Sequence, residues 1–210
     1  MPLPLECDLV CYGHNVVAQT SERLQETVSA YVHRFEAMRC FETPALQVLE
    51  DALRAQGMRV CFMAEYFLPD MNVLRAQPCA YELRVLTDLS GLDAAQWSNC
   101  LSLHARERDM LGVAAYDGDK LVGLAACSAD CATMWQIGVD VLPDYRRQGI
   151  ASAVTSRLAL EVLERGIVPF YCAAWSNIAS VRNAIRSGFR PAWVELTARD
   201  EAFVQHMNGI

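Results

Sequence analysis

A run of six residues, Arg146-Arg147-Gln148-Gly149-Ile150-Ala151, combines the residue types that bind an anion at the start of a helix. The preceding residues, Met134 to Leu142, are mostly apolar and stop at Pro143-Asp144, which indicates a buried strand followed by a turn. Apolar residues then recur at helical spacing until Gly166 ends the helix, so one helix face is expected to be buried. Free N–H groups, the helix dipole and two arginines together predict a phosphate site.

A second apolar segment follows this helix and strengthens the interpretation. Val168 to Ala174 reads as another buried strand, so strand, helix and strand form a right-handed parallel unit. Asn177 comes next, and a short helix is expected from Ile178 to Arg186. Gly188-Phe189 then leads to a last expected strand, Ala192 to Thr197.

The order and spacing of these motifs resemble the GCN5-related N-acetyltransferase (GNAT) superfamily over residues 81 to 199. The resemblance is carried by Val141-Leu142-Pro143, Arg146-x-x-Gly149-x-Ala151, Asn177 and Gly188-Phe189. It implies an α/β (α+β) fold with a mixed, mostly antiparallel sheet, in which a central parallel strand pair is splayed and helices flank the sheet. A small α/β N-terminal module is expected to precede that sheet.

The domain organisation expected from periodicity has one boundary, near residue 78. Residues 1–78 are predicted to form an N-terminal α/β module that supplies part of the acceptor pocket, and residues 79–210 to form the acyltransferase domain. In the module we expect strands at Leu5 to Tyr12 and Met58 to Leu68. Helices are expected at Ser21 to Phe35 and from Thr43 to Gly57.

The first part of the second domain is predicted to contain three strands and one helix before the strand Met134 to Leu142. Tyr81 to Leu86 alternates as a strand does, and Ala94 to Arg106 is predicted to be helical. Leu111 to Tyr116 and Lys120 to Ala126 flank Asp117-Gly118-Asp119, which is a strong hairpin signal.

The cofactor implied by the resemblance is acetyl-CoA, or coenzyme A after transfer, used as an acyl donor. The splayed strand would offer backbone groups to the pantetheine arm, and the turn and helix start would hold the pyrophosphate. The cofactor-binding residues expected on this basis are Ile137, Val139, Val141, Arg146, Arg147, Gln148, Gly149, Ile150, Ala151, Ser152 and Asn177.

The catalytic groups are less clearly indicated, because the family's usual tyrosine position is occupied by Ala184. Tyr171, Cys172 and Ser176 lie nearest the expected thioester along the chain, and Tyr116 and Tyr145 stay open as other proton donors. Cys172 would also permit an acyl-cysteine route, although no histidine is close in sequence.

Asp140 stands in an apolar run, so it requires a partner or a raised pKa, and either a structural or a catalytic role fits. On the acceptor side, the expected substrate-binding residues are Ser128, Asp130 and Gln136.

Two classes of function fit these features. The first is an N-acyltransferase that transfers an acetyl or short acyl group from acyl-CoA to the primary amine of a small molecule by direct attack. The second is a non-catalytic acyl-CoA-binding or regulatory module, which the absence of the usual tyrosine favours. Acetylation of a protein amine is a third possibility that no residue selects.

Composition and charge narrow the possible partners, location and metal chemistry of the protein. The chain has 210 residues, 53% of them hydrophobic, and a formal net charge of −7, which argues against a nucleic-acid partner. No long apolar run or basic leader indicates a membrane or secretory protein, so a cytoplasmic monomer or homodimer is expected. Nine cysteines without a Cys-x-x-Cys pair, and four scattered histidines, predict reduced thiols and no metal site.

Overall fold

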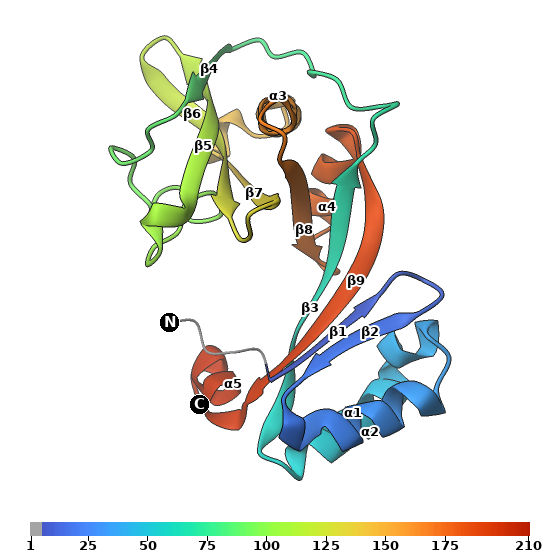
Figure 1. The fold of residues 1–210 in the computed structure, drawn as a ribbon. Helices are drawn as coiled ribbons and strands as arrows, with labels where there is room; N and C mark the ends of the chain where they lie inside the picture. Colours follow the sequence, from blue (N-terminus) through green and yellow to red (C-terminus); the bar gives the residue numbers. More distant parts are fainter. Residues whose placement is uncertain (1–5) are drawn as a thin grey trace. The chain divides into compact units, whose positions relative to one another are not determined.

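The computed structural model describes residues 6–210, and within that range the chain forms nine strands and five α-helices. The strands make a single mixed sheet in the order β2-β1-β9-β3-β8-β7-β6-β5-β4. The neighbours β7 and β8 run parallel, whereas the pairs β1–β2, β1–β9, β4–β5, β5–β6 and β6–β7 are antiparallel. The expected fold class is therefore confirmed (Figure 1).

The chain divides into two compact units, one made of Met1–Glu65 with Ala192–Ile210 and the other of Tyr66–Pro191. The division falls inside β3 (Met58–Pro69) and inside β9 (Phe189–Asp200), so each of these strands contributes to both units. The expected organisation into domains 1–78 and 79–210 stays a prediction. Leu5, where the first strand was expected to begin, lies outside the described residues.

The first unit is a sheet layer with two helices on one face (Figure 1). Its elements besides parts of β3 and β9 are β1 (Cys7–Cys11), β2 (Val16–Thr20), α1 (Glu22–Arg34), α2 (Thr43–Arg54) and α5 (Glu201–Asn208). Alternate residues of β1 are buried against apolar residues of both helices, including Leu24 and Leu49. Strand alternation and helical periodicity thus meet in one small core.

Asp8 faces away from that core and makes the stability of the first unit depend on pH. Burial, with the neighbouring Glu195 carboxylate as a lesser cause, raises the pKa of Asp8 to about 6. Its Oδ1 has no hydrogen-bond partner among the described residues. Because the pKa is higher in the folded than in the unfolded chain, the protonated carboxyl favours folding at low pH, and this contribution is lost as the pH rises through about 6.

Asp8→Asn should therefore stabilise the protein at pH 7.5 by about 1–2 kcal/mol and leave its stability near pH 4 almost unchanged. Urea unfolding of both proteins at the two pH values measures the difference. Asp119→Asn, in the exposed β5–β6 turn, serves as the control and should change neither value. An equal gain at both pH values would show that the Asp8 charge is not the cause.

The second unit contains the parallel strand pair. Its elements are β4 (Glu82–Leu86), β5 (Asp109–Asp117), β6 (Lys120–Ala129), β7 (Met134–Val141), α3 (Ile150–Glu164), β8 (Val168–Ala174) and α4 (Ile178–Arg186), with the remaining parts of β3 and β9. The helix α3 packs on β5, β6 and β7, and α4 packs on α3 and β8. The β5–β6 hairpin turns at Gly118, which has φ +59°.

The helix α3 is buried around most of its circumference, not on one face as its apolar pattern predicts. Its small polar residues are buried as well and find partners on other segments of the unit. Ser156 Oγ accepts from the backbone N–H of Gln77 at 3.0 Å, and Thr155 Oγ1 accepts from Asn183 Nδ2 at 3.1 Å. Side chains this short let neighbouring segments approach a second face of the helix.

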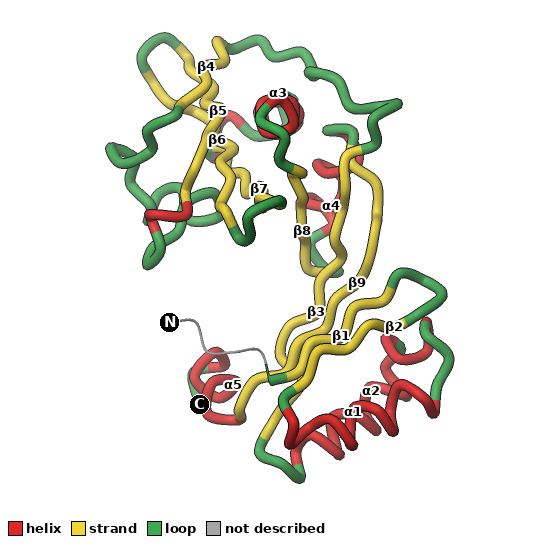
Figure 2. The backbone as a smooth tube through the Cα atoms, in the orientation of Figure 1, coloured by secondary structure: helices red, strands yellow, loops and turns green. Residues whose placement is uncertain are grey.

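The prediction of a helix at Ala94 to Arg106 is wrong. This stretch forms a series of turns that leads into one short 3₁₀ helix at Arg106–Arg108, and Figure 2 draws the residues before that helix as loop. A side chain within the stretch takes a backbone N–H group that a helix would use, because Ser102 Oγ accepts from Ala105 N at 2.9 Å. Such local bonds compete with helix formation.

Two elements were not expected, the strand β2 and the helix α5. β2 pairs along its whole length with β1, as Cys7↔Thr20 to Cys11↔Val16. α5 begins at a cap that could have been recognised, because Asp200 Oδ1 accepts from Phe203 N at 2.8 Å. It ends at Gly209, whose backbone is left-handed with φ +69°.

Candidate functional site

The turn between β7 and α3 leaves the start of α3 without a side-chain cap. Gly149 is the N-cap with φ +85°, and Arg147 also has a left-handed backbone with φ +62°. Left-handed residues beside right-handed ones turn successive N–H groups toward the same side, which creates an anion-binding concavity. A Cβ at Gly149 would meet nothing within 4 Å, so the space in front of the helix is open.

The side chains of this turn point in different directions. Arg146 Nε donates to the carbonyl oxygen of Val141 at 3.0 Å, which keeps its guanidinium beside the end of β7. Gln148 Oε1 accepts from the Tyr81 hydroxyl at 2.7 Å. Ile150 and Ser152 are buried, at 1% and 5% exposure, so their side chains do not face outward.

The parallel strands β7 and β8 are paired over only part of their length. Their register runs from Met134↔Val168 to Ile137↔Tyr171, and among the described residues no pairing continues beyond that point. On its other edge β7 stays paired with β6 as far as Val141. One edge of Gly138–Val141 therefore presents backbone N–H and C=O groups without a strand partner, which require another partner or water.

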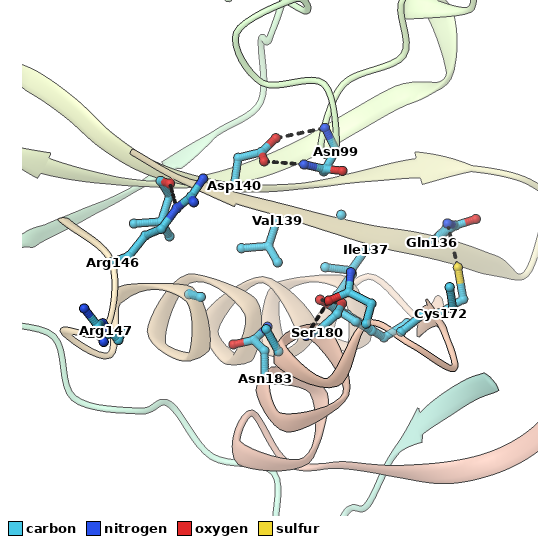
Figure 3. A pocket seen from close by; sticks show the side chains of 18 residues that line it. Asn99, Gln136, Ile137, Val139, Asp140, Arg146, Arg147, Cys172, Ser180 and Asn183 are labelled. Atoms are coloured by element: carbon cyan, nitrogen blue, oxygen red, sulfur yellow. Dashed lines mark hydrogen bonds between the residues drawn. The ribbon is translucent and has the colours of Figure 1, made fainter. Parts of the chain in front are cut away.

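A cleft of about 700 Å³ lies where these strands separate and reaches the start of α3. Figure 3 shows the side chains around it. Of the expected cofactor-binding residues, those that line it are Ile137, Val139, Val141, Arg146, Arg147, Ala151 and Asn177. Gln136, Asp140, Tyr171 and Cys172 line it too, whereas Gln148, Gly149, Ile150, Ser152, Ser128 and Asp130 are not among the residues that line it.

Tyr171 stands at the point of strand separation and is one of the residues that line the cleft. Its side chain is 3% exposed and contacts the rings of Phe67 and Phe189. The hydroxyl lies 2.8 Å from Ser180 Oγ on α4, which also lines the cleft. Burial raises the pKa of Tyr171, so this hydroxyl stays protonated at neutral pH. Ala184, one helical turn after Ser180, is fully buried.

Asp140 has the partners that its place in an apolar run requires. Its Oδ2 accepts from the backbone N–H of Asn99 at 2.9 Å, and its Oδ1 accepts from Asn99 Nδ2 at 2.5 Å. The Cys100 thiol adds a third contact at 3.3 Å. Asp140 therefore fixes the segment around Asn99 across β7, as Figure 3 shows.

That segment passes so close to β7 that only glycine fits at residue 138. A Cβ on Gly138 would overlap the backbone carbonyl group of Asn99 and would come within 2.9 Å of Cys100 Cα. Backbone therefore lies on backbone at this crossing. This contact was not expected, because the stretch Ala94 to Arg106 was predicted to be a helix.

The other residues expected on the acceptor side are partly brought together. Gln136 Nε2 donates to Cys172 Sγ at 3.1 Å, across the gap between β7 and β8. Ser128 is the cross-strand neighbour of Gln136, and its hydroxyl lies 3.4 Å from Asp130 Oδ1. Asp130 is exposed and lies outside the cleft.

Three polar cleft residues were not expected from the sequence: Asn99, Ser180 and Asn183. Two of them had a detectable signal, because they follow Asn177 by three and six residues on a short helix and so share its face. Asn177 itself caps α4, since its Oδ1 accepts from Ser180 N at 3.1 Å.

A family model described as GNAT acetyltransferase matches residues 16–192. The chain belongs to the GNAT acetyltransferase family. GNAT proteins transfer acyl groups from acyl-CoA, and acetyl-CoA is the family's acyl donor. No curated protein sequence matches the chain.

Solved structures agree with GNAT membership at the level of the fold. A GCN5-related N-acetyltransferase from Kribbella flavida superposes with a TM-score of 0.56 and 17% identity, covering 72% of this chain and 63% of its own. A GNAT-family acetyltransferase from Novosphingobium aromaticivorans gives 0.51 and 19%, covering 68% and 66%. The chain thus spans just under two thirds of those two proteins. A GCN5-related N-acetyltransferase from Sphaerobacter thermophilus gives 0.50 and 16%, covering 92% and 76%.

Acetyl-CoA fits the features of this GNAT cleft. The open space at Gly149, the arginine pair and the uncapped helix start suit a pyrophosphate, and the unpaired edge of β7 suits an arm that carries amide groups. In residues 6–210 no group of three or more His, Cys, Asp or Glu side chains is arranged to hold a metal ion. None of the helices described in that range is long and apolar enough to cross a membrane.

Proposed function

We propose that this protein is an N-acyltransferase that moves an acetyl or short acyl group from acyl-CoA to the primary amine of a small molecule. The observation that carries the proposal is the cleft itself, in which an uncapped helix start, two arginines and an unpaired strand edge converge. The donor would lie with its pyrophosphate at the turn 146–149 and its thioester between β7 and β8.

Binding of the donor would use different groups along its length. Arg146 and Arg147 supply charge, while Gln148, Gly149, Ile150, Ala151 and Ser152 contribute backbone N–H groups at the start of α3. Ile137, Val139 and Val141 offer their backbone to the pantetheine arm, and Asn177 lines the same cleft. Their apolar side chains are no obstacle, because such pairing uses the main chain.

The chemistry requires that the thioester carbonyl be polarised and the departing thiolate be protonated. A backbone N–H of β7 beyond Ile137, that of Val139 or its neighbour, is positioned to donate to the developing oxyanion. For the thiolate we assign the proton to the Tyr171–Ser180 hydroxyl pair, which takes the place of the tyrosine absent at Ala184. The attacking nitrogen loses one proton as the amide forms, and that proton restores the hydroxyl pair.

Direct attack by the amine is favoured over an acyl-cysteine route. Cys172 lines the cleft, but no histidine is among the residues that line it, so an activating base for the thiol is missing there. We assign Asp140 to holding Asn99 in place, because both of its carboxylate oxygens already accept hydrogen bonds. The amine would then have to lose its proton before it enters the site.

Incubation of the purified protein with acetyl-CoA and a panel of alkyl- and arylamines tests this proposal. We expect thiol release that depends on the amine, together with the N-acetyl product in the mass spectrum. A reaction without amine controls for the nine cysteines of the chain. Saturable CoA binding with no turnover on any amine would instead support an acyl-CoA-binding module. A cytoplasmic location and a monomer or homodimer without nucleic-acid or membrane partners stay predictions.

A further inference from the structure

A second, smaller cavity of about 180 Å³ adjoins the main cleft. Asn99, Gln136 and Gly138 line both spaces, so the two meet at these residues. The rest of the small cavity is mostly polar and includes Ser102 and Ser128. A molecule in this cavity would reach the acyl group through the opening between Asn99 and Gln136.

The two amides at this opening are oriented by bonds from their own NH₂ groups. Asn99 Nδ2 donates to Asp140 at 2.5 Å, and Gln136 Nε2 donates to Cys172 Sγ at 3.1 Å. Each amide therefore keeps its carbonyl oxygen for another partner. Among the described residues none donates to Asn99 Oδ1 or Gln136 Oε1, and Figure 3 shows both oxygens turned away from those partners.

We propose that Asn99 Oδ1 and Gln136 Oε1 accept the two N–H groups of a neutral primary amine, whose chain lies in the small cavity. This inference rests on the proposed function and names its acceptor class. A primary amine has two N–H groups and one lone pair, so fixing both N–H groups aims the lone pair at the thioester carbonyl carbon.

Neutral amide oxygens suit this task better than carboxylates would. A carboxylate beside the nitrogen would stabilise the ammonium form and raise the amine pKa, which removes the lone pair that must attack. An amide oxygen accepts the N–H without adding a charge. Asp140, which lines the main cleft, is held by Asn99 and Cys100. Asp109, which lines the small cavity, is paired with Arg106 at 2.9 Å.

The size of the cavity limits the acceptor. A volume of about 180 Å³ corresponds to the liquid volume of roughly six water molecules, which accommodates an amine of about six to ten non-hydrogen atoms. The serine hydroxyls in the lining favour a polar group at the far end of the chain. 4-Amino-1-butanol has these properties and serves as the probe.

The kinetic test compares 4-amino-1-butanol with its N-methyl derivative, which has a single N–H. We expect the wild-type protein to favour the primary amine at least 10-fold in kcat/KM, and Gln136→Met to reduce that preference to below about 3-fold with the KM for acetyl-CoA unchanged. Gln25→Met, on the exposed surface of α1, is the matched control. An unchanged preference in Gln136→Met would overturn the inference and leave acyl transfer intact.

A binding test separates the inference from the proposed function. The protein is saturated with CoA, which carries no acyl group, and both amines are titrated by calorimetry at pH 9. Tighter binding of the primary amine that Gln136→Met abolishes supports the inference even if no amine is acetylated. Equal binding of the two amines to the wild-type protein overturns the inference. A kinetic result would also overturn it, namely acetylation of tryptamine at the same rate as 4-amino-1-butanol.

Discussion

Gly149→Glu is expected to weaken CoA binding by about 100-fold or more while the protein stays folded. The space in front of Gly149 is open, so the new side chain fits without a clash, and its carboxylate lies where we place the pyrophosphate. Like charges in a confined anion site repel, and about 100-fold in Kd corresponds to ~2.7 kcal/mol. Isothermal titration calorimetry with CoA measures the loss.

Gly149→Ala is the matched control, because it introduces the same backbone strain without a charge. Both variants force a residue with a Cβ into φ +85°, which should lower the stability by ~1 kcal/mol. CoA affinity in the alanine variant should fall only a few-fold. If the glutamate variant has a normal melting curve and binds CoA as tightly as Gly149→Ala does, the pyrophosphate lies elsewhere.

Tyr171→Phe is expected to lower kcat by about 10- to 100-fold with little change in the KM for acetyl-CoA. The substitution removes the hydroxyl that lies 2.8 Å from Ser180 Oγ and keeps the ring in contact with Phe67 and Phe189. Ser180→Ala should cost about as much, and the double variant little more than either, because the two hydroxyls would act as one unit.

Tyr145→Phe controls for the loss of a tyrosine hydroxyl as such. The Tyr145 hydroxyl donates to Asp117 at 3.0 Å and Tyr145 is not among the residues that line the cleft, so its removal should leave kcat within about twofold. Wild-type rates in Tyr171→Phe and in Ser180→Ala would show that the thiolate leaves without this pair.

Elements with strong local signals could be predicted from the sequence. β8 and α4 were expected with the bounds that the structure has, and the β5–β6 hairpin follows from Asp117-Gly118-Asp119. These segments combine periodicity with a turn or capping residue at the end. Local preference and tertiary packing agree there, so a single sequence is sufficient.

The region around Asn99 could not be predicted, because its conformation depends on a residue far along the chain. Asp140 takes the Asn99 N–H, which a helix would have bonded within itself, and buried Trp97 packs on the β-sheet. The apolar spacing of that stretch is compatible with a helix and with turns. Asn99, at the junction of the two cavities, therefore became visible only in three dimensions, whereas Gln136 was already expected as a substrate-binding residue.

The same distinction applies to the candidate site. Arg147 and Ala151 line the cleft, as expected. They belong to a short motif whose conformation depends on residues close together in the sequence. Ser152 was expected as a contact from sequence proximity, but its direction on the helix turns its side chain into the core. The spacing of residues in the sequence locates the turn. It does not show which side chains of the turn point into the cleft and which point into the core.

The glycine crossing at residue 138 restricts how the acceptor range of this protein can change. Any residue larger than glycine would overlap the carbonyl group of Asn99, so random single substitutions at this position destroy the junction and cannot tune it. Because the overlap is with backbone atoms, no substitution of the Asn99 side chain relieves it. An engineer who wants to admit bulkier amines should shorten or rebuild the loop around Asn99, and a library of loop lengths would be a better starting point than a library of point variants.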